Sequence, residues 1–208
     1  MSLAHLFDNI STSSISDALD GAGLPGSCLG IAPLARGMRM AGEAYTVRYQ
    51  PSPRYAASAI GDYVDAVPSK AVVAIDNGAR LDCSVWGDIL SSLAVSRRFA
   101  GTVIDGVCRD AEKTISLNYP MFSRGKFMRT GAYRIELAEI CGTVSIGGVR
   151  ILAGDMIVAD DDGVVAIPRA EVQRIAEESR RIEERDAHII RCIGEGMNLV
   201  DSKAARAR

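Results

Sequence analysis

Two short apolar runs on either side of a helix-like segment dominate the first half of the chain. The runs at residues 71–75 and 102–104 suit buried strands, and the segment from 87 to about 99 has helical spacing. A strand, a helix and a strand joined by short links are typical of a parallel, right-handed crossover. Residues 43–49 alternate as a further strand that stops at Pro51-Ser52-Pro53, so the pattern predicts an α/β fold.

After about Tyr119 the pattern changes to short apolar runs separated by turn residues. Gly147-Gly148, Gly154-Asp155 and Asp162-Gly163 are hairpin and turn signals. We therefore expect the second half to be mostly β, with strands at residues 143–146, 149–152, 156–159 and 164–167.

Three further segments have helical patterns. A helix is expected over residues 13–19, capped by Ser11 or Thr12 and ended by Gly21 and Gly23, and residues 55–65 also have helical spacing. A long helix is expected from 168 to about 193, and residues 202–208 are expected to fray. The apolar seam of this long helix should pack on the body and on a neighbouring subunit. The seam residues are Val172, Ile175, Ser179, Ile182, Asp186, Ile189 and Ile193.

We interpret residues 1–167 as one α/β domain and residues 168–208 as its C-terminal helical extension. The length of 208 residues is near that of one domain, and 48% hydrophobic residues can bury a core, which excludes a disordered chain. A net charge of −2 gives no basic surface for nucleic acid or an anionic membrane. No apolar run is long enough for a membrane span, and the first residues lack a signal-peptide pattern, so a cytoplasmic protein is expected.

Cysteine and histidine usage narrows the chemistry. The five cysteines are odd in number and widely spread, without a Cys-x-x-Cys pair, which argues against a disulfide framework or structural zinc. His5 and His188 are the only histidines, so a Ser-His-Asp triad or a metal site would have to use one of them. An enzyme built from this chain is expected to use carboxylates, arginine, backbone amides and a hard metal ion.

Two motifs have ordinary structural interpretations. Residues 21–26 match G-x-G-x-x-G, but a helix precedes them and none opens from them, so we interpret them as a loop that ends a helix. Asp160-Asp161-Asp162-Gly163 offers adjacent carboxylates for a cation. Neighbouring strand residues point to opposite faces and Asp-Gly favours a hairpin, so a turn is expected.

The ends of the two buried strands are more informative. Arg109-Asp110 follow the strand at 102–104, and Asp88 lies at the start of the helix that follows the strand at 71–75. Ligands collect beyond the carboxyl ends of parallel strands, and the first N–H groups of a helix can bind an anion. One interpretation is a site for an acidic small molecule, with Asp110 free to recruit a divalent metal. The alternative is an exposed ion pair beside an ordinary helix start.

Asp88, twenty intervening residues and then Arg109-Asp110 reproduce the D-x20-R-D signature of the RraA-like family, which the chain resembles. This family contains the aldolases of 4-hydroxy-4-methyl-2-oxoglutarate and 4-carboxy-4-hydroxy-2-oxoadipate. The resemblance covers most of the chain in order, through residues 85–88, 104–110, 122–125, 144–149 and 153–165.

The resemblance implies a swivelling β/β/α fold assembled as homotrimers or homohexamers, with active sites between subunits. It implies that Arg109 contacts the keto oxygen of the substrate and that Asp110 anchors Mg2+ or Mn2+, largely through waters. A glutamate from the neighbour's C-terminal helix should approach the site. Glu184 matches best and Glu183 nearly as well, while a solvated helix face is the alternative. The segment implied to bind the pyruvyl carboxylate and keto group is Gly87, Asp88, Ile89 and Leu90.

The implied activity is that of a class II pyruvate aldolase acting on a small 2-oxo acid. Cleavage of a 4-hydroxy-2-oxo acid leaves the enolate of pyruvate, whose charge a Lewis acid and Arg109 would stabilise. Oxaloacetate yields the same enolate by losing CO2, so decarboxylation is expected as a second activity. The competing interpretation is a regulator that binds and inhibits a ribonuclease. Such regulators are expected to lack the extension at 168–208, which favours the aldolase.

Overall fold

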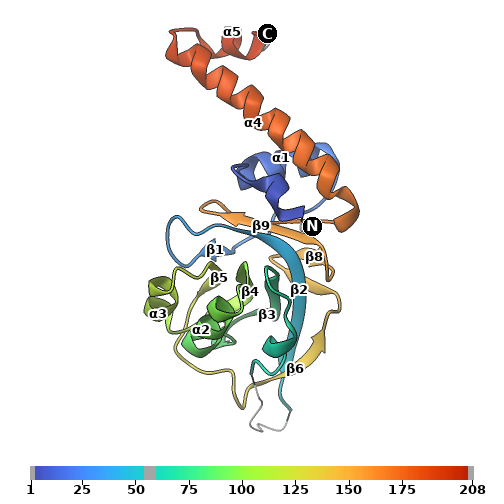
Figure 1. Cartoon of the computed structure of the whole chain (residues 1–208), viewed down its shortest axis with the longest axis vertical. Coiled ribbons are helices and arrows are strands. Elements are labelled where there is room, and N and C mark those ends of the chain that lie inside the picture. Colours follow the sequence, from blue (N-terminus) through green and yellow to red (C-terminus); the bar gives the residue numbers. More distant parts are fainter. Residues whose placement is uncertain (1–2, 54–59, 206–208) are drawn as a thin grey trace.

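The computed structural model describes residues 3–53 and 60–205 (Figure 1). Its centre is four adjacent parallel strands, β2 to β5, within an eight-stranded sheet. Their bounds are Met40–Pro51, Val72–Ser84, Gly101–Cys108 and Met121–Lys126. All eight residues of β4 are buried, which explains its continuous apolar pattern.

The sheet lies between a helical layer and a second β layer. Along β3, Val73 and Ile75 pack in the cluster that includes Trp86 and Ala94, whereas Val72 and Ala74 pack in the cluster of the later strands. This alternation buries both faces of the sheet. The helical side carries α2 (Asp88–Ser96) and α3 (Ala111–Ser116). This α/β architecture confirms the expected fold class.

The second β layer consists of hairpins joined to the central sheet by β2. Residues 40–43 of β2 pair with β9, and residues 44–48 pair with β3, so one long curved strand serves both parts (Figure 1). Its other end pairs with β6, while the short β1 pairs with β5. The bounds of β1 and of β6 to β10 are Ala32–Pro33, Ile135–Ile140, Val144–Ile146, Val149–Ile151, Met156–Asp160 and Gly163–Ile167.

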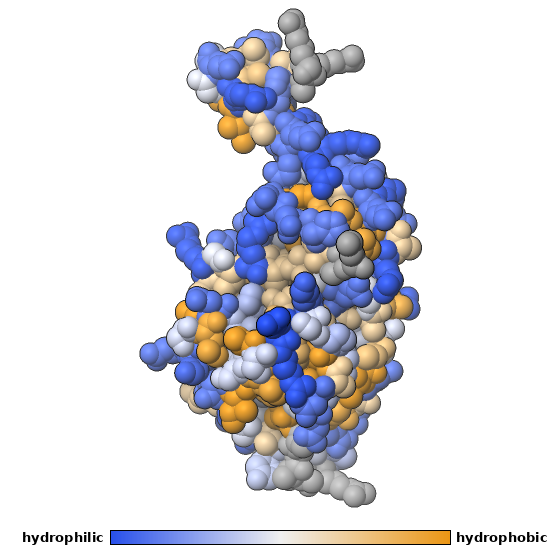
Figure 2. Space-filling view, viewed as in Figure 1, coloured by the Kyte–Doolittle hydropathy of each residue, from blue (hydrophilic) through white to orange (hydrophobic). Residues whose placement is uncertain are grey.

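A helical arm extends from the body. The first half of α4 (Val172–Gly194) packs on α1 (Thr12–Gly21), where Ile175 and Ile182 are buried with Ile15 and Leu19. Its second half projects away from the body, with α5 (Leu199–Ala204) at its tip (Figure 1). Apolar side chains gather near that tip (Figure 2). The exposed ones include Ile190, Ile193, Met197, Leu199 and Val200. The 3-10 turns η1, η2 and η3 cover Leu3–Phe7, Val64–Ala66 and Arg169–Glu171.

Most expected elements are confirmed, including the helix capped by Ser11, the strand–helix–strand unit and the paired hairpins. Three expectations were wrong. The strand that starts near residue 72 does not end at residue 75 but continues to Ser84, with register shifts against β4 after Asp76 and after Arg80. Residues 60–65 form turns and part of η2 rather than an α-helix, while residues 54–59 lie outside the described residues.

The expected frayed tail is helical up to Ala204, because Ser202 is buried and its hydroxyl donates to the carbonyl of Asn198 (2.8 Å). Residues 206–208 lie outside the described residues. Within the described residues, no helix is both long enough and apolar enough to cross a membrane.

Candidate functional site

Two helix starts meet at the carboxyl edge of the parallel strands. Asp88 is the first residue of α2, which follows β3, and Asp110 directly precedes α3, which follows β4. Because β3 and β4 are parallel neighbours, both helices begin at the same edge of the sheet. The backbone N–H of Arg109 donates to the carbonyl of Trp86 (2.9 Å), which ties the two connections together.

The three signature residues lie side by side. The Oδ2 atom of Asp110 is 3.2 Å from Nε of Arg109 and accepts a long hydrogen bond from the backbone N–H of Asp88 (3.4 Å). Gly87 makes this approach possible: a Cβ atom there would lie 2.5 Å from Oδ2 of Asp110 and 3.2 Å from Arg109. The spacing of the signature therefore corresponds to one contiguous cluster.

Asp110 has an unusual backbone conformation for a residue with a side chain. Its φ of 54° and ψ of 41° place it in the left-handed region, which aspartate tolerates better than most residues. It occupies the cap position of α3, yet its carboxylate makes no capping hydrogen bond there and turns towards α2 instead. The Asp110 carboxylate thus contacts the start of α2 instead of capping α3, and such a departure from local preference is typical of functional positions.

A pocket of about 140 Å³ opens beside this cluster. It presents polar groups of Asp88, Arg109 and Thr130 together with the apolar side chains of Ile60 and Leu90. Nε of Arg109 is paired with Asp110, and within residues 3–53 and 60–205 its two Nη groups have no acceptor, so they are available to a ligand. A small anion could therefore contact a guanidinium and the start of a helix at once.

The expected amide donors of α2 are only partly free. The N–H of Ile89 donates to Oδ1 of Asp88 (2.8 Å), and its side chain is 76% exposed. The N–H of Leu90 has no acceptor among the described residues, as helix geometry predicts for a first-turn amide. The N–H of Asp88 donates to Asp110, so the segment 87–90 offers the amide of Leu90 to a ligand, with the carboxylate of Asp88 beside it.

The donor set fits a hard divalent cation held mainly by substrate and water. Asp110 supplies a half-exposed carboxylate oxygen, and Asp88 supplies a second carboxylate in the same cluster. No group of three or more His, Cys, Asp or Glu that could hold a metal occurs in the part of the chain that the structure describes. Mg2+ and Mn2+ suit such a site, because Mg2+ keeps several waters and needs only one or two protein carboxylates.

Thiol chemistry is not favoured here. Cys108 directly precedes Arg109 and is buried, and this burial raises the pKa of its thiol. Burial likewise raises the pKa of the Cys83 thiol near the end of β3. Reactive cysteines need a stabilised thiolate, so neither residue is a candidate nucleophile.

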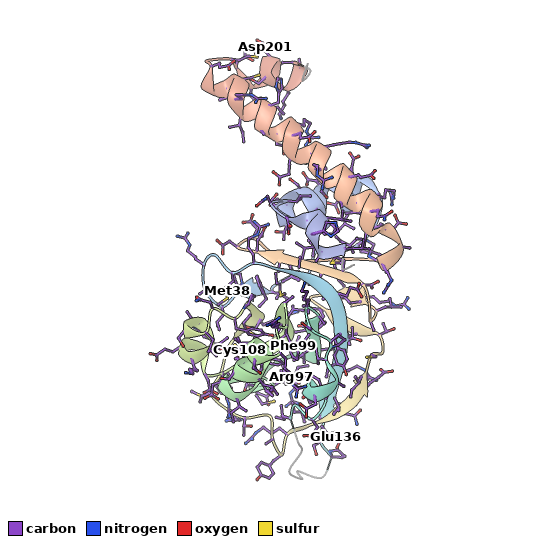
Figure 3. The ribbon with its side chains drawn as sticks, viewed as in Figure 1. Met38, Arg97, Phe99, Cys108, Glu136 and Asp201 are labelled. Atoms are coloured by element: carbon purple, nitrogen blue, oxygen red, sulfur yellow. The ribbon has the colours of Figure 1, made fainter. Side chains whose placement is uncertain are left out.

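The two candidate glutamates of the long helix differ in their surroundings. Glu183 accepts hydrogen bonds from the backbone N–H (2.8 Å) and hydroxyl (2.6 Å) of Ser11, and these bonds lower the pKa of its carboxyl. Glu184 is exposed. In Figure 3, Cys108 lies in the body and Asp201 lies at the distant tip of the helical arm. Glu184 lies on α4 between them in the chain and does not line the pocket of its own chain.

The two motifs with structural interpretations behave as expected. Residues 21–26 run from the last residue of α1 and close against β10, where the N–H of Ala166 donates to the carbonyl of Gly26 (2.8 Å). Asp160 pairs with Gly163 across the hairpin, and its carboxylate accepts from the N–H (2.8 Å) and hydroxyl (2.6 Å) of Thr12. These contacts hold α1 on the sheet.

Comparison with known proteins identifies the family. The sequence model of the RraA-like family, described as Aldolase/RraA, matches residues 12–166. The chain belongs to the RraA-like family. A Halalkalibacterium halodurans protein named "Putative 4-hydroxy-4-methyl-2-oxoglutarate aldolase" is 32% identical over 93% of this chain and 90% of its own. Protein DlpA of Legionella pneumophila is 38% identical over 94% of this chain, which spans about a third (32%) of the length of DlpA.

Two solved structures have the same fold as this chain. An uncharacterized protein from Pseudomonas syringae superposes with a TM-score of 0.90 at 37% identity, covering 97% of this chain and 96% of that one. Streptomyces coelicolor RraAS2, described as an unusual member of the RNase ES inhibitor RraA protein family, superposes with a TM-score of 0.79 at 25% identity. That superposition covers 89% of this chain and 93% of RraAS2.

Ile60 and Thr130 of the pocket wall were missed by the sequence analysis. Thr130 lies in the connection after β5, outside every predicted element, and Ile60 lies before η2, in the segment 55–65 that was expected to be helical. Both reach the pocket only through the tertiary fold. A hydroxyl pair beneath the pocket, Ser91 and Thr114, was also missed, although Ser91 falls four residues after Gly87 on the predicted helix.

Proposed function

We propose that the chain is a divalent-metal-dependent class II pyruvate aldolase. Its substrates would be 4-hydroxy-2-oxo acids such as 4-hydroxy-4-methyl-2-oxoglutarate, which it would cleave to pyruvate. The observation that carries the proposal is the convergence of Asp88, Arg109 and Asp110 on one small pocket at a helix start. The name of the Halalkalibacterium relative supports the same reaction.

The chain's own groups suit this bond cleavage. A base removes the 4-hydroxyl proton, the C4 oxygen becomes the carbonyl of the leaving product as the bond between C3 and C4 breaks, and the electron pair of that bond forms the enolate of pyruvate. Protonation of the enolate at C3 then gives pyruvate. The free Nη groups of Arg109 would donate to the developing oxyanion at C2, while the amide of Leu90 would bind the adjacent carboxylate. The paired Nε of Arg109 fixes the direction of the guanidinium.

Asp110 and Asp88 would hold Mg2+ or Mn2+ beside the 2-oxo acid. When bound, the cation supplies Lewis-acid stabilisation of the enolate oxygen. Asp110 has a second role, because its carboxylate also orients Arg109 and faces the start of α2. The same arrangement would accept oxaloacetate, whose loss of CO2 yields the same enolate, so we propose oxaloacetate decarboxylation as a side activity.

Assembly into a homotrimer or homohexamer forms part of the proposal. The pocket is open on the surface of a single chain, and the exposed Glu184 lies on the projecting helix α4 rather than at the pocket. A neighbouring copy would bring its Glu184 to the site. The arm would then serve the partner's pocket rather than its own.

Substitution of the signature pair tests the proposed reaction. Arg109→Ala and Asp110→Ala should each remove most turnover while leaving the oligomer intact, and each lost interaction is expected to cost about 3 kcal/mol of transition-state stabilisation. Glu112→Gln, an exposed carboxylate in the first turn of α3, is the matched control. Rates like those of the wild type in either alanine variant would refute the assignment.

The ribonuclease-regulator function is the second candidate, and the superposition on RraAS2, described as a member of the RNase ES inhibitor RraA protein family, supports it. Residues 1–167 make up about four-fifths of the chain, whereas the superposition on RraAS2 covers 89% of it. The similarity therefore extends into the helical extension, so the extension by itself does not separate aldolases from members of the inhibitor family. Tight, stoichiometric binding of a purified ribonuclease of the RNase E type, without pyruvate release from any 4-hydroxy-2-oxo acid, would favour this function over the aldolase.

A further inference from the structure

Beneath the pocket, a buried hydroxyl pair links the starts of α2 and α3. Ser91 is 0% exposed and Thr114 is 1% exposed, and their hydroxyl oxygens are 2.9 Å apart. Ser91 comes from the second turn of α2 and Thr114 from α3. The two short helices that present Asp88 and Asp110 are therefore joined directly by a polar contact in an otherwise apolar core.

The hydrogen bonds of Ser91 run towards the pocket. Its hydroxyl oxygen accepts from Nε1 of Trp86 (3.0 Å), and its hydroxyl donates to the carbonyl of Gly87 (2.9 Å). A hydroxyl has one donor and two acceptor sites, so these two bonds leave one acceptor site for the hydroxyl of Thr114. Every hydrogen-bonding site of Ser91 is thereby filled, which fixes Gly87 relative to α3.

Thr114 completes the link to the metal-ligand candidate. Its backbone N–H donates to the carbonyl of Asp110 (3.2 Å), and its hydroxyl oxygen lies 3.4 Å from the same carbonyl. Gly87 and Asp110 are the two residues whose close approach brings the signature together. The pair therefore joins the carbonyl of Gly87, through the Ser91 hydroxyl, to the first turn of α3, where the backbone of Thr114 is bonded to Asp110.

We propose that Ser91 and Thr114 are positioning residues that set the separation of the two helix starts and so align the anion-binding groups of the pocket. Neither hydroxyl touches the ligand, because both are buried beneath Gly87. The inference deepens the proposed function and rests on it for the turnover readout. Its binding readout needs only that the pocket takes a 2-oxo-acid-like anion.

Trp86 provides a built-in reporter. It is the only tryptophan of the chain, it lines the pocket, and its indole N–H is bonded to Ser91. Its ring also stacks on Tyr119 with centroids 6.1 Å apart. Indole fluorescence should therefore respond both to an anion in the pocket and to removal of the Ser91 hydroxyl.

The experiment measures binding of oxalate, a planar dianion that resembles the enolate of pyruvate, in the presence of Mg2+. Calorimetry gives the dissociation constant of the intact oligomer, and Trp86 emission gives the local response. Ser91→Ala and Thr114→Val should raise the Kd of oxalate about tenfold, the scale seen when groups that orient ligands are lost. Ser96→Ala, an exposed hydroxyl on the same helix, and Thr114→Ser, which keeps the hydroxyl, should bind like the wild type.

Turnover separates positioning from simple loss of folded protein. Damaged packing lowers the fraction of active enzyme and hence the apparent kcat at an unchanged KM, whereas misaligned amides raise KM. We expect KM to rise in Ser91→Ala and Thr114→Val, with recovery in Thr114→Ser. Oxalate affinity and KM like those of the wild type in both Ser91→Ala and Thr114→Val would overturn the inference and leave the aldolase assignment standing.

The two proposals fail in different ways. If the wild type binds oxalate, the variants bind it weakly and no 4-hydroxy-2-oxo acid is cleaved, the positioning role stands and the aldolase proposal fails. If calorimetry shows no binding of oxalate to the wild type, both proposals are overturned, because the pocket then does not take this class of anion.

Discussion

The carboxylate of Asp110 lies 3.4 Å from the backbone nitrogen of Asp88, although the two residues are 22 positions apart. The parallel pairing of β3 and β4 brings both helix starts to one sheet edge, and the left-handed backbone of Asp110 turns its side chain towards α2. Arg109 joins the cluster through Nε. The RraA-like signature therefore describes two helix starts that share one pocket.

Gly87 should be intolerant of a side chain. The Cβ atom of Gly87→Ala would lie 2.5 Å from Oδ2 of Asp110, so the carboxylate or the helix start must move. We expect kcat/KM to fall about a hundredfold, because displacement of catalytic groups by an ångström costs roughly that factor. Circular dichroism and size-exclusion chromatography should show an unchanged fold and assembly.

Gly21→Ala is the matched control for Gly87→Ala. Gly21 ends α1, and a Cβ atom there would have no neighbour within 4 Å. Its activity should equal that of the wild type. Equal activity of Gly87→Ala and the wild type would mean that the contact between Gly87 and Asp110 has no part in the reaction.

Asp88→Asn separates proton transfer from binding. Asparagine has the same shape and still accepts the hydrogen bond from the N–H of Ile89, but it cannot exchange a proton as a carboxylate does. If Asp88 handles a proton, kcat measured at saturating Mg2+, where loss of a metal ligand is compensated, should fall by about 10²- to 10⁴-fold at a similar KM. A raised KM at unchanged kcat would instead show that Asp88 acts only in binding. Asp82→Asn, at an exposed ion pair with Arg80, is the control.

Glu183 should contribute to stability in a pH-dependent way. Hydrogen bonds from Ser11 lower its pKa below the usual 4.5, so the stabilisation is present above about pH 4.5 and is lost as the pH falls through the lowered value. Glu183→Gln should reduce the free energy of unfolding at pH 7 by about 0.5–1 kcal/mol, a small value because the carboxylate is largely solvated. Urea unfolding at pH 7 and pH 3 should show that the difference shrinks in acid.

The neighbouring Glu184 should show the opposite behaviour. It is exposed, so Glu184→Gln should leave the urea midpoint unchanged. If the partner subunit's helix completes the site, the same variant should reduce turnover at least about tenfold. Normal turnover of Glu184→Gln would refute a catalytic role for Glu184. A loss of turnover confined to Glu183→Gln would show that Glu183, and not Glu184, has that role.

The buried strands and the signature loops could be predicted because their patterns are local. Residues 71–75 are apolar throughout since both faces of β3 are covered, and the spacing of Asp88 and Arg109 is visible without a structure. The orientation of Asp110 could not be predicted, because local preference favours capping of α3. Helical spacing likewise cannot tell Glu183 from Glu184, since the distinction depends on Ser11, 172 residues away.

The most direct test of the proposed activity is pyruvate release from 4-hydroxy-4-methyl-2-oxoglutarate and from oxaloacetate, coupled to lactate dehydrogenase. Each substrate is assayed with Mg2+, with EDTA, and after Mg2+ is restored. The pocket of Asp88, Arg109 and Asp110 predicts release from the hydroxy acid that EDTA abolishes and Mg2+ restores, with oxaloacetate as a second substrate. No release from either substrate, or release that EDTA leaves unchanged, would contradict a metal-dependent aldolase.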